Sequence, residues 1–273
     1  MFYSTAPKTK LGASYRTLEL IYHTAVRNVR KTHNNAIFAI ATNITQMIFM
    51  VLAFYFMFSI LGLRGFAVRG DFLVYIMSGI FLYMTHLKAV GAVMGSEGPT
   101  SPMMQHAPLN TAISIAGSIV SALYIQVMSL VVILFVYHVA ITPLDIDKPA
   151  GAFGMLMLAF FTGLGVGMIL LALKPWFPGF VSIFMLVYQR ANMIASGKMF
   201  LANTLPTYML VMFDWNPLFH CIDQARGFAF VNYFPRNSDW HYALWLGLAL
   251  LMIGLMGEFY TRKHSSLSWS ARR

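Results

Sequence analysis

The sequence predicts an all-α membrane protein that crosses the bilayer several times. Apolar residues make up 58 % of its 273 residues and charged residues only 10 %, against about 45–50 % and about 25 % in a typical soluble domain. Six continuous apolar stretches are long enough to cross a bilayer as helices, which takes about 20 residues each. Strands of a membrane barrel would instead alternate in segments of about 10 residues. These observations exclude a soluble enzyme, a secreted disulfide scaffold and a disordered protein.

The residues before the first span read as an amphipathic helix over 11–31. Leu11, Tyr15, Leu18 and Tyr22 recur at three- and four-residue steps, which places them on one face of a helix. Basic residues populate the rest of the surface. Such a helix is expected to lie in the membrane interface with its apolar side toward lipid. Docking onto a partner, or bordering a pore entrance, is the alternative.

Six spans are expected, at residues 36–61, 72–94, 112–141, 152–173, 177–195 and 240–260. Two of them have a polar side: the second contains His86 and Lys88, and the fifth contains Gln189, Arg190 and Asn192. The whole chain is expected to form one membrane domain. Its expected parts are a cytoplasmic amphipathic region at 1–35, the six-span region at 36–260 and a basic cytoplasmic tail at 261–273.

Basic residues at the two ends predict the orientation. Residues 1–35 hold six Lys or Arg and one acidic residue, and residues 261–273 hold four Lys or Arg. Because basic flanks stay in the cytoplasm, both termini are expected there, as six spans require. The net charge of +10 is then explained by topology and anionic lipid, not by nucleic acid. No cleavable signal peptide is expected, because the first long apolar run begins too late for one.

Two segments outside the spans carry further expectations. Residues 95–110 are rich in proline and include Glu97 and His106; they read as a plain loop or as a surface for a cytoplasmic partner. Residues 196–239 hold apolar patches that are too short to span and are broken by prolines. Patches of this length beside a membrane are typical of re-entrant or interfacial segments. We therefore expect a re-entrant external segment between the fifth and sixth spans.

Ionisable residues inside the spans are the strongest functional signal. Lys88 and Arg190 would each cost about 2.5–3.5 kcal/mol at the bilayer centre, so they are expected to face a bundle interior or a wet cavity. Lys88 could instead snorkel to the interface, and Arg190 could pair across helices. Aromatic residues such as Tyr55 and Phe56 face lipid or form a stacking surface for sugar rings.

The search for catalytic chemistry returns little. Ser196-Gly197-Lys198 resembles the end of a P-loop but lacks its first glycine and its final Ser or Thr, so no ATPase is expected in this chain. No histidines are at metal-ligand spacing, so no metal is expected. His220 and Asp223 could pair as a base and its orienter, or make a structural hydrogen bond, and no nucleophile stands beside them.

One ordered series of motifs resembles a known family. Ser196-Gly197 is followed by Leu205-Pro206, by Asn216-Pro217-Leu218 with His220, and then by Asp223 and Arg226. Together with the hydropathy profile, this series resembles the membrane subunit of ABC-2 type exporters of capsular polysaccharide and O-antigen. The family often has Glu where Asp223 stands.

The resemblance implies a function and its partners. The chain would be the permease subunit of an ATP-driven exporter in the bacterial inner membrane, moving a lipid-linked polysaccharide. It would form a homodimer and work with two cytoplasmic ATP-binding subunits, which would hold ATP and Mg. This chain would need no cofactor.

Roles for individual residues follow from the same resemblance and from the charges. The substrate pathway is expected to include Arg190, Lys88, Lys198, Tyr55, Phe56 and Tyr188. The external gate is expected to include Ser196, Gly197, Asn216, Pro217, His220, Asp223 and Arg226. Coupling to the ATP-binding subunits is expected at Glu97 and His106.

Three other functions stay open at this point. The first is an ABC-2 permease for a small hydrophobic molecule or a lipid. The second is an intramembrane enzyme acting on lipid-linked sugars, with His220 and Asp223 as its acid–base pair. The third is a passive channel, which would conduct without nucleotide.

Overall fold

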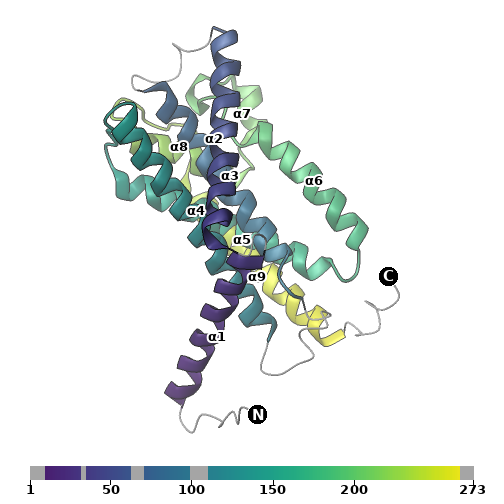
Figure 1. Cartoon of the computed structure of the whole chain (residues 1–273). Helices are drawn as coiled ribbons and strands as arrows, with labels where there is room; N and C mark the ends of the chain where they lie inside the picture. The colour runs from purple at the N-terminus through teal and green to yellow at the C-terminus, as the bar shows by residue number, and fades with distance from the viewer. Residues whose placement is uncertain (1–9, 32–34, 63–70, 99–109, 265–273) are drawn as a thin grey trace.

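The computed structural model describes residues 10–31, 35–62, 71–98 and 110–264. Within these ranges the chain is helical and contains no strand, which confirms the all-α prediction (Figure 1). In chain order the elements are α1 (Lys10–Lys31), α2 (Ala36–Ile60), α3 (Phe72–Met94), α4 (Thr111–Ala140), α5 (Pro149–Leu173), α6 (Pro178–Ala195), the 3₁₀ helix η2 (Ala202–Thr204), α7 (Thr207–Phe213), α8 (Pro217–Ala229) and α9 (Trp240–His264).

Five helices, α2, α3, α4, α5 and α9, are long and apolar enough to cross a membrane. Their outward surfaces are apolar: Phe49, Phe135 and Trp245 are each more than 60 % exposed. Exposed apolar area on this scale is rare on soluble monomers, so these helices indicate a multi-pass membrane protein. The sixth expected span corresponds to α6, which has 18 residues and is not among the five. Gln189, Arg190 and Asn192 give α6 a polar side, and its crossing stays a prediction.

The centre of the molecule is formed by α3 and α5. In their most apolar stretches 78 % of α3 and 67 % of α5 is buried, against 28 % for α2 and α4. Glycines on α5 allow its neighbours to approach closely, as in many membrane bundles. A Cβ on Gly163 would lie 2.5 Å from the His86 carbonyl oxygen of α3, and one on Gly165 would lie 2.8 Å from the Leu250 Cβ of α9. Only glycine fits at these two contacts.

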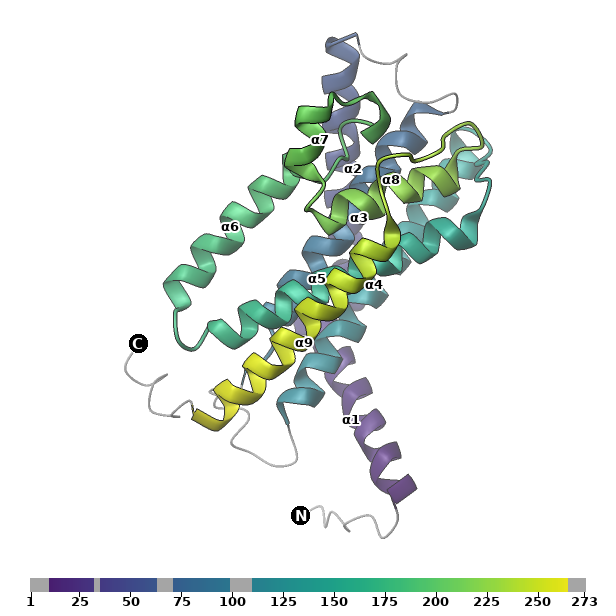
Figure 2. The same ribbon diagram turned by 180° about the vertical axis from the view of Figure 1, so that it is seen from behind.

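The predicted amphipathic segment is confirmed as a helix, α1, but only its C-terminal half packs against the bundle. Its C-terminal half packs on α4, where Asn28 Nδ2 donates to Ser118 Oγ at 3.0 Å. Its N-terminal half extends away from the bundle (Figures 1 and 2). The four side chains that predicted the helix are therefore exposed, by 85 % at Leu11, 74 % at Tyr15, 65 % at Leu18 and 64 % at Tyr22.

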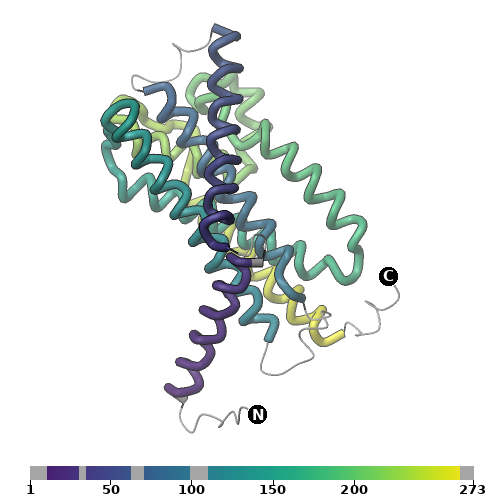
Figure 3. Tube along the Cα trace, in the orientation of Figure 1, coloured from purple at the N-terminus to yellow at the C-terminus, as the bar shows by residue number. Residues whose placement is uncertain are grey.

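Two further helices differ in where they lie: α6 is outside the bundle and α8 is packed within it. Helix α6 runs along its outside, from the turn after α5 to α7, as the tube in Figure 3 shows. Helix α8 packs against α3, α5 and α9, and its Leu218, Phe219, Cys221 and Ile222 are at most 1 % exposed. With 13 residues and about 1.5 Å of rise per residue, α8 is too short to cross a core of about 30 Å. The re-entrant assignment of 196–239 stays a prediction.

Candidate substrate cavity

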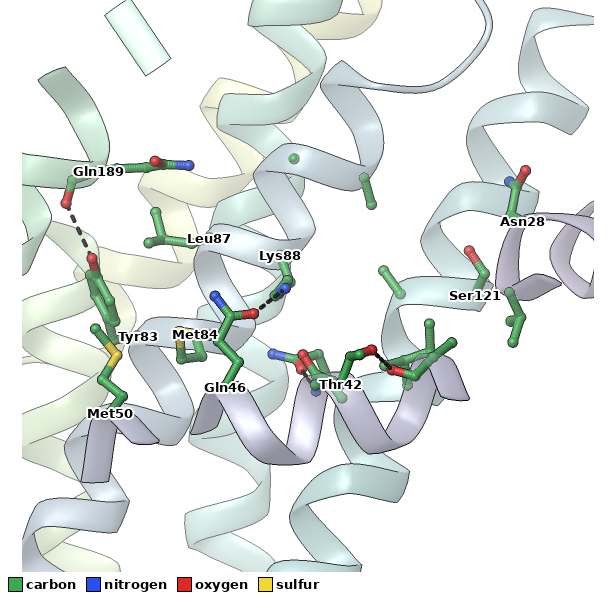
Figure 4. Close-up of a pocket in the computed structure, with 18 of the residues that line it drawn as sticks. Asn28, Thr42, Gln46, Met50, Tyr83, Met84, Leu87, Lys88, Ser121 and Gln189 are labelled. Atoms are coloured by element: carbon green, nitrogen blue, oxygen red, sulfur yellow. Dashed lines mark hydrogen bonds between the residues drawn. The ribbon is translucent and has the colours of Figure 1, made fainter. Parts of the chain in front are cut away.

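A cavity of about 900 Å³ lies between α2, α3, α4 and α6, with the C-terminal end of α1 at its edge. Its wall contains amide, hydroxyl and apolar side chains, together with two basic residues. Figure 4 shows part of this wall, with Lys88 at its centre. None of its described lining residues is acidic. The polar members are Asn28, Thr42, Asn43, Gln46, Tyr83, Lys88, Ser121, Gln126, Gln189 and Arg190.

The two basic residues are the ones that the sequence analysis expected to lie inside the membrane. Lys88 on α3 donates from Nζ to Gln46 Oε1 of α2 at 2.8 Å, and Figure 4 shows the two side chains pointing toward each other. Arg190 on α6 is exposed. Within the described part of the chain, no hydrogen bond or ion pair involves its guanidinium. The structure thus brings both cations to the wall of one cavity.

A buried amide network forms the α2–α4 side of the cavity, and the sequence reasoning missed it. Asn43 Nδ2 donates to Gln126 Oε1 at 2.6 Å and to Ser129 Oγ at 2.9 Å. Gln126 Nε2 donates to Thr85 Oγ1 at 3.4 Å. Asn43 Oδ1 is buried without a hydrogen-bond partner in the described part of the chain. Single amides inside otherwise apolar runs were the signal that could have identified this network.

The aromatic residues expected along the pathway lie elsewhere. His86 Nδ1 lies 3.0 Å from the Ala159 carbonyl and must donate to it. His86 Nε2 is then the acceptor nitrogen of the neutral ring, and the hydroxyl of Tyr188 on α6 donates to it at 2.7 Å. Tyr55 packs against Phe56 and Phe72. None of the three expected residues, Tyr55, Phe56 and Tyr188, lines the cavity. Tyr188 instead ties α6 to α3.

Lys198, the third expected pathway cation, is also absent from the cavity wall. It is 3 % exposed, and its Nζ lies 3.4 Å from the centroid of the Tyr83 ring. Tyr83 itself does line the cavity. Lys198 is therefore separated from the cavity by one aromatic side chain.

The Ser-Gly motif is held by Arg226 of α8, which is fully buried. Arg226 Nη1 donates to the carbonyls of Gly197 at 2.8 Å and Phe200 at 2.6 Å, and Nη2 donates to the carbonyl of Lys198 at 2.7 Å. Gly197 has φ +76°, and a Cβ there would lie 2.8 Å from the Phe219 ring. Ser196 is fully buried beside it.

The Asn-Pro motif starts α8 and joins it to α6. Asn216 Oδ1 accepts from Leu218 N–H at 3.1 Å as the N-cap, with Pro217 in the first turn, the arrangement that both residue types favour. Asn216 Nδ2 donates to Asn192 Oδ1 at 3.0 Å and to the Ala195 carbonyl at 2.9 Å. Asn216 therefore caps α8 and holds the start of this helix against the end of α6.

His220 and Asp223 do not pair with each other. His220 Nε2 donates to the Asp214 carbonyl at 2.6 Å, and Nδ1 accepts from Asp239 N–H at 3.0 Å. Asp223 accepts from the hydroxyls of Tyr233 and Ser238, the latter at 2.7 Å. Each residue has its own structural hydrogen bonds, so this pair lacks the geometry of a base and its orienter.

Cys221, which follows His220 directly on α8, is fully buried. Burial raises the pKa of the nearby Cys221 thiol, which disfavours a thiolate. The described residues contain no cluster of three or more His, Cys, Asp or Glu side chains that could hold a metal ion.

One of the two expected coupling residues can be placed. Glu97 follows α3, and its backbone N–H donates to Ser114 Oγ of α4 at 3.0 Å. His106 lies outside the described residues.

Comparisons with known proteins return no match: no protein-family model matches the chain, and no curated protein sequence matches it.

Proposed function

We propose that this chain is the permease subunit of an ATP-driven exporter that moves an anionic, lipid-linked polysaccharide of the capsular or O-antigen kind across the bacterial inner membrane. One observation carries the proposal: a cavity among apolar helices is lined by Lys88 and Arg190, with no acidic residue among its described lining residues. Cations in such a place are costly, and an anionic cargo explains why they are there.

The rest of the cavity wall suits a glycan. Asn28, Thr42, Asn43, Gln126 and Gln189 offer amide and hydroxyl groups, which exchange hydrogen bonds readily with sugar hydroxyls. Apolar residues fill the spaces between them. A wall of many weak polar contacts holds a polymer without fixing it at one position.

The position of α1 supports coupling to a partner. Asn28 and Val29 of α1 line the cavity, while the N-terminal half of the same helix is exposed beyond the bundle. A partner that binds this exposed half and shifts α1 would change the shape of the cavity directly. Two ATP-binding subunits, acting on a dimer of this chain with both termini in the cytoplasm, would supply that motion along with ATP and Mg.

A permease for a lipid or a small hydrophobic molecule is the second candidate. Met50, Met84, Leu87, Leu186 and Met193 also line the cavity and favour an apolar cargo. An uncharged cargo of this kind leaves the two cations without a role. The enzyme alternative is disfavoured because His220 and Asp223 have separate structural partners.

The exporter class is tested by purifying the tagged chain from its native membrane in mild detergent and identifying what comes with it. We expect a stoichiometric cytoplasmic protein with an intact P-loop, whose ATPase rate changes when the two are reconstituted. A solitary chain that turns over a lipid-linked sugar without ATP would overturn the proposal in favour of the enzyme.

Arg190→Ala tests the cargo's charge. We expect glycan export to fall while the amount of assembled complex is unchanged, because the Arg190 guanidinium binds no other described residue. Arg190→Lys, which keeps the charge, is expected to retain most of the export. Equal loss of export and of assembled complex in Arg190→Ala would show that Arg190 is structural.

A further inference from the structure

Lys198 carries a buried side-chain amine, and burial lowers the pKa of this amine to about 7. It follows α6, its side chain is 3 % exposed, and its Nζ has no hydrogen-bond partner in the described part of the chain. Two aromatic rings face the ammonium group instead, Tyr83 at 3.4 Å and Phe54 at 4.9 Å from Nζ to the ring centroid. Cation–π contacts of this kind offset part of the cost of burial but neutralise no charge.

The two rings differ in one respect. Tyr83 lines the cavity, whereas Phe54 does not. Tyr83 therefore stands between Lys198 and the cavity, with one ring face on the ammonium group. In Figure 4 its side chain lies beside Met50, and its hydroxyl points to Gln189.

The backbone of Lys198 is held by Arg226, whereas the Tyr83 ring in front of it is packed among apolar side chains and makes one hydrogen bond, to α6. Arg226 Nη2 donates to the Lys198 carbonyl at 2.7 Å, and Arg226 is itself fully buried. The Tyr83 hydroxyl donates to the Gln189 carbonyl of α6 at 3.2 Å. A displacement of α6 would release the Tyr83 ring and leave Lys198 in its place.

We infer that Lys198 is a further anion-binding position, reached from the cavity when the Tyr83 ring turns aside. The groups it would bind are the phosphates or carboxylates of the cargo, and in that respect the inference rests on the proposed function. Lys88 and Arg190 would hold the anion inside the cavity, and Lys198 would receive it next. The Tyr83 ring closes the route in the conformation described here.

Thiol labelling tests whether Tyr83 is the barrier. Lys198→Cys is made in a Cys221→Ser background and exposed to an anionic, membrane-impermeant methanethiosulfonate, with the purified chain in detergent. We expect slow labelling with Tyr83 present and labelling about tenfold faster with Tyr83→Ala, as a buried thiol becomes accessible. Tyr83→Leu serves as a second opening variant that keeps an apolar side chain.

Phe54→Ala is the matched control, because it removes the other ring over the same ammonium group without opening the cavity wall. Labelling of Lys198→Cys should stay slow there. Lys88→Cys, in the cavity wall, should be labelled in every background. Equal labelling with Tyr83→Ala and Phe54→Ala, or no labelling with Tyr83→Ala while Lys88→Cys reacts, would overturn the inference.

Inorganic phosphate tests the charge of the site. With Tyr83→Ala, phosphate is expected to raise the melting temperature relative to chloride at equal ionic strength. The combination of Tyr83→Ala with Lys198→Met is expected to lose part of that rise. An unchanged rise would overturn the anion-binding role. Both experiments use the purified chain without ATPase or glycan, so their outcomes are independent of whether it exports a polysaccharide.

Discussion

Two arginines of this chain have different tasks. Arg226 has no exposed surface and donates to three backbone carbonyls of residues 197–200, so it holds a turn in place. Arg190 is exposed at the cavity and binds no other described side chain or carbonyl. The two arginines look alike in the sequence, yet one is structural and the other is available to a ligand.

Replacement of Arg226 is expected to destabilise the chain. Arg226→Met leaves three backbone carbonyls without their donor, and each buried polar group left without a partner costs about 1–3 kcal/mol. We expect a lower melting temperature and faster maleimide reaction of Cys221, which is fully buried on the same helix. Arg236→Met, a substitution in the loop after α8, is the control and should change neither. A melting temperature unchanged in Arg226→Met would contradict this account of the turn.

At the scale of helices, the close contacts of α5 define which parts can move. Gly163 brings α3 against α5, and Gly165 brings α9 against it from another side. Helix α6 is joined to the bundle by side-chain hydrogen bonds such as Tyr188 to His86. We infer that α3, α5 and α9 move as one unit and that α6 moves against them.

Gly163→Ala tests this packing. Its Cβ would lie 2.5 Å from the His86 carbonyl oxygen, so α3 and α5 must separate, at a cost of about 1–3 kcal/mol. Gly154→Ala on the same helix meets nothing within 4 Å and should be neutral or stabilising, by up to about 1 kcal/mol. Melting temperatures of the two variants make the comparison. Equal destabilisation would mean that helix propensity, not the contact with α3, sets the effect.

The helices were more predictable than the site. Hydropathy placed the spans at 72–94 and 36–61 within a residue of α3 and α2, because length and apolarity are local properties. Lys88 and Arg190 were each identified as costly intramembrane cations. Their meeting in one cavity could not be predicted, since it depends on how α3 and α6 are rotated about their axes. The link between Asn43 and Gln126, 83 residues apart, was missed for the same reason.

At the scale of the whole molecule, α1 is the helix whose N-terminal apolar side chains extend beyond the bundle and pack against no other described helix there. The side chains of Leu11, Tyr15, Leu18 and Tyr22 form an exposed apolar stripe, while its other end lines the cavity. Lipid or a partner subunit would cover this stripe. The two cases give different results when the stripe is made polar.

Under the proposed function, Tyr15→Ser combined with Leu18→Ser is expected to reduce the amount of ATP-binding subunit that co-purifies. The chain itself should stay in the membrane, because five other helices are apolar enough to hold it there. Thr17→Ala, an exposed position on the same helix, is the control. Undiminished co-purification would assign the stripe to lipid.

The charge of the cavity also has an electrical consequence. A bacterial inner membrane is negative inside, and one elementary charge that crosses it changes in energy by about 2.3 kcal/mol per 100 mV. Under the proposed function, each anionic group that leaves the cytoplasm moves down this potential and releases that free energy. Lys88 and Arg190 lower the cost of its passage through hydrocarbon. The voltage would thus share the work with ATP. Collapsing it with valinomycin and potassium, at constant ATP, should slow export of an anionic polymer, and a constant rate would mean that no net charge crosses.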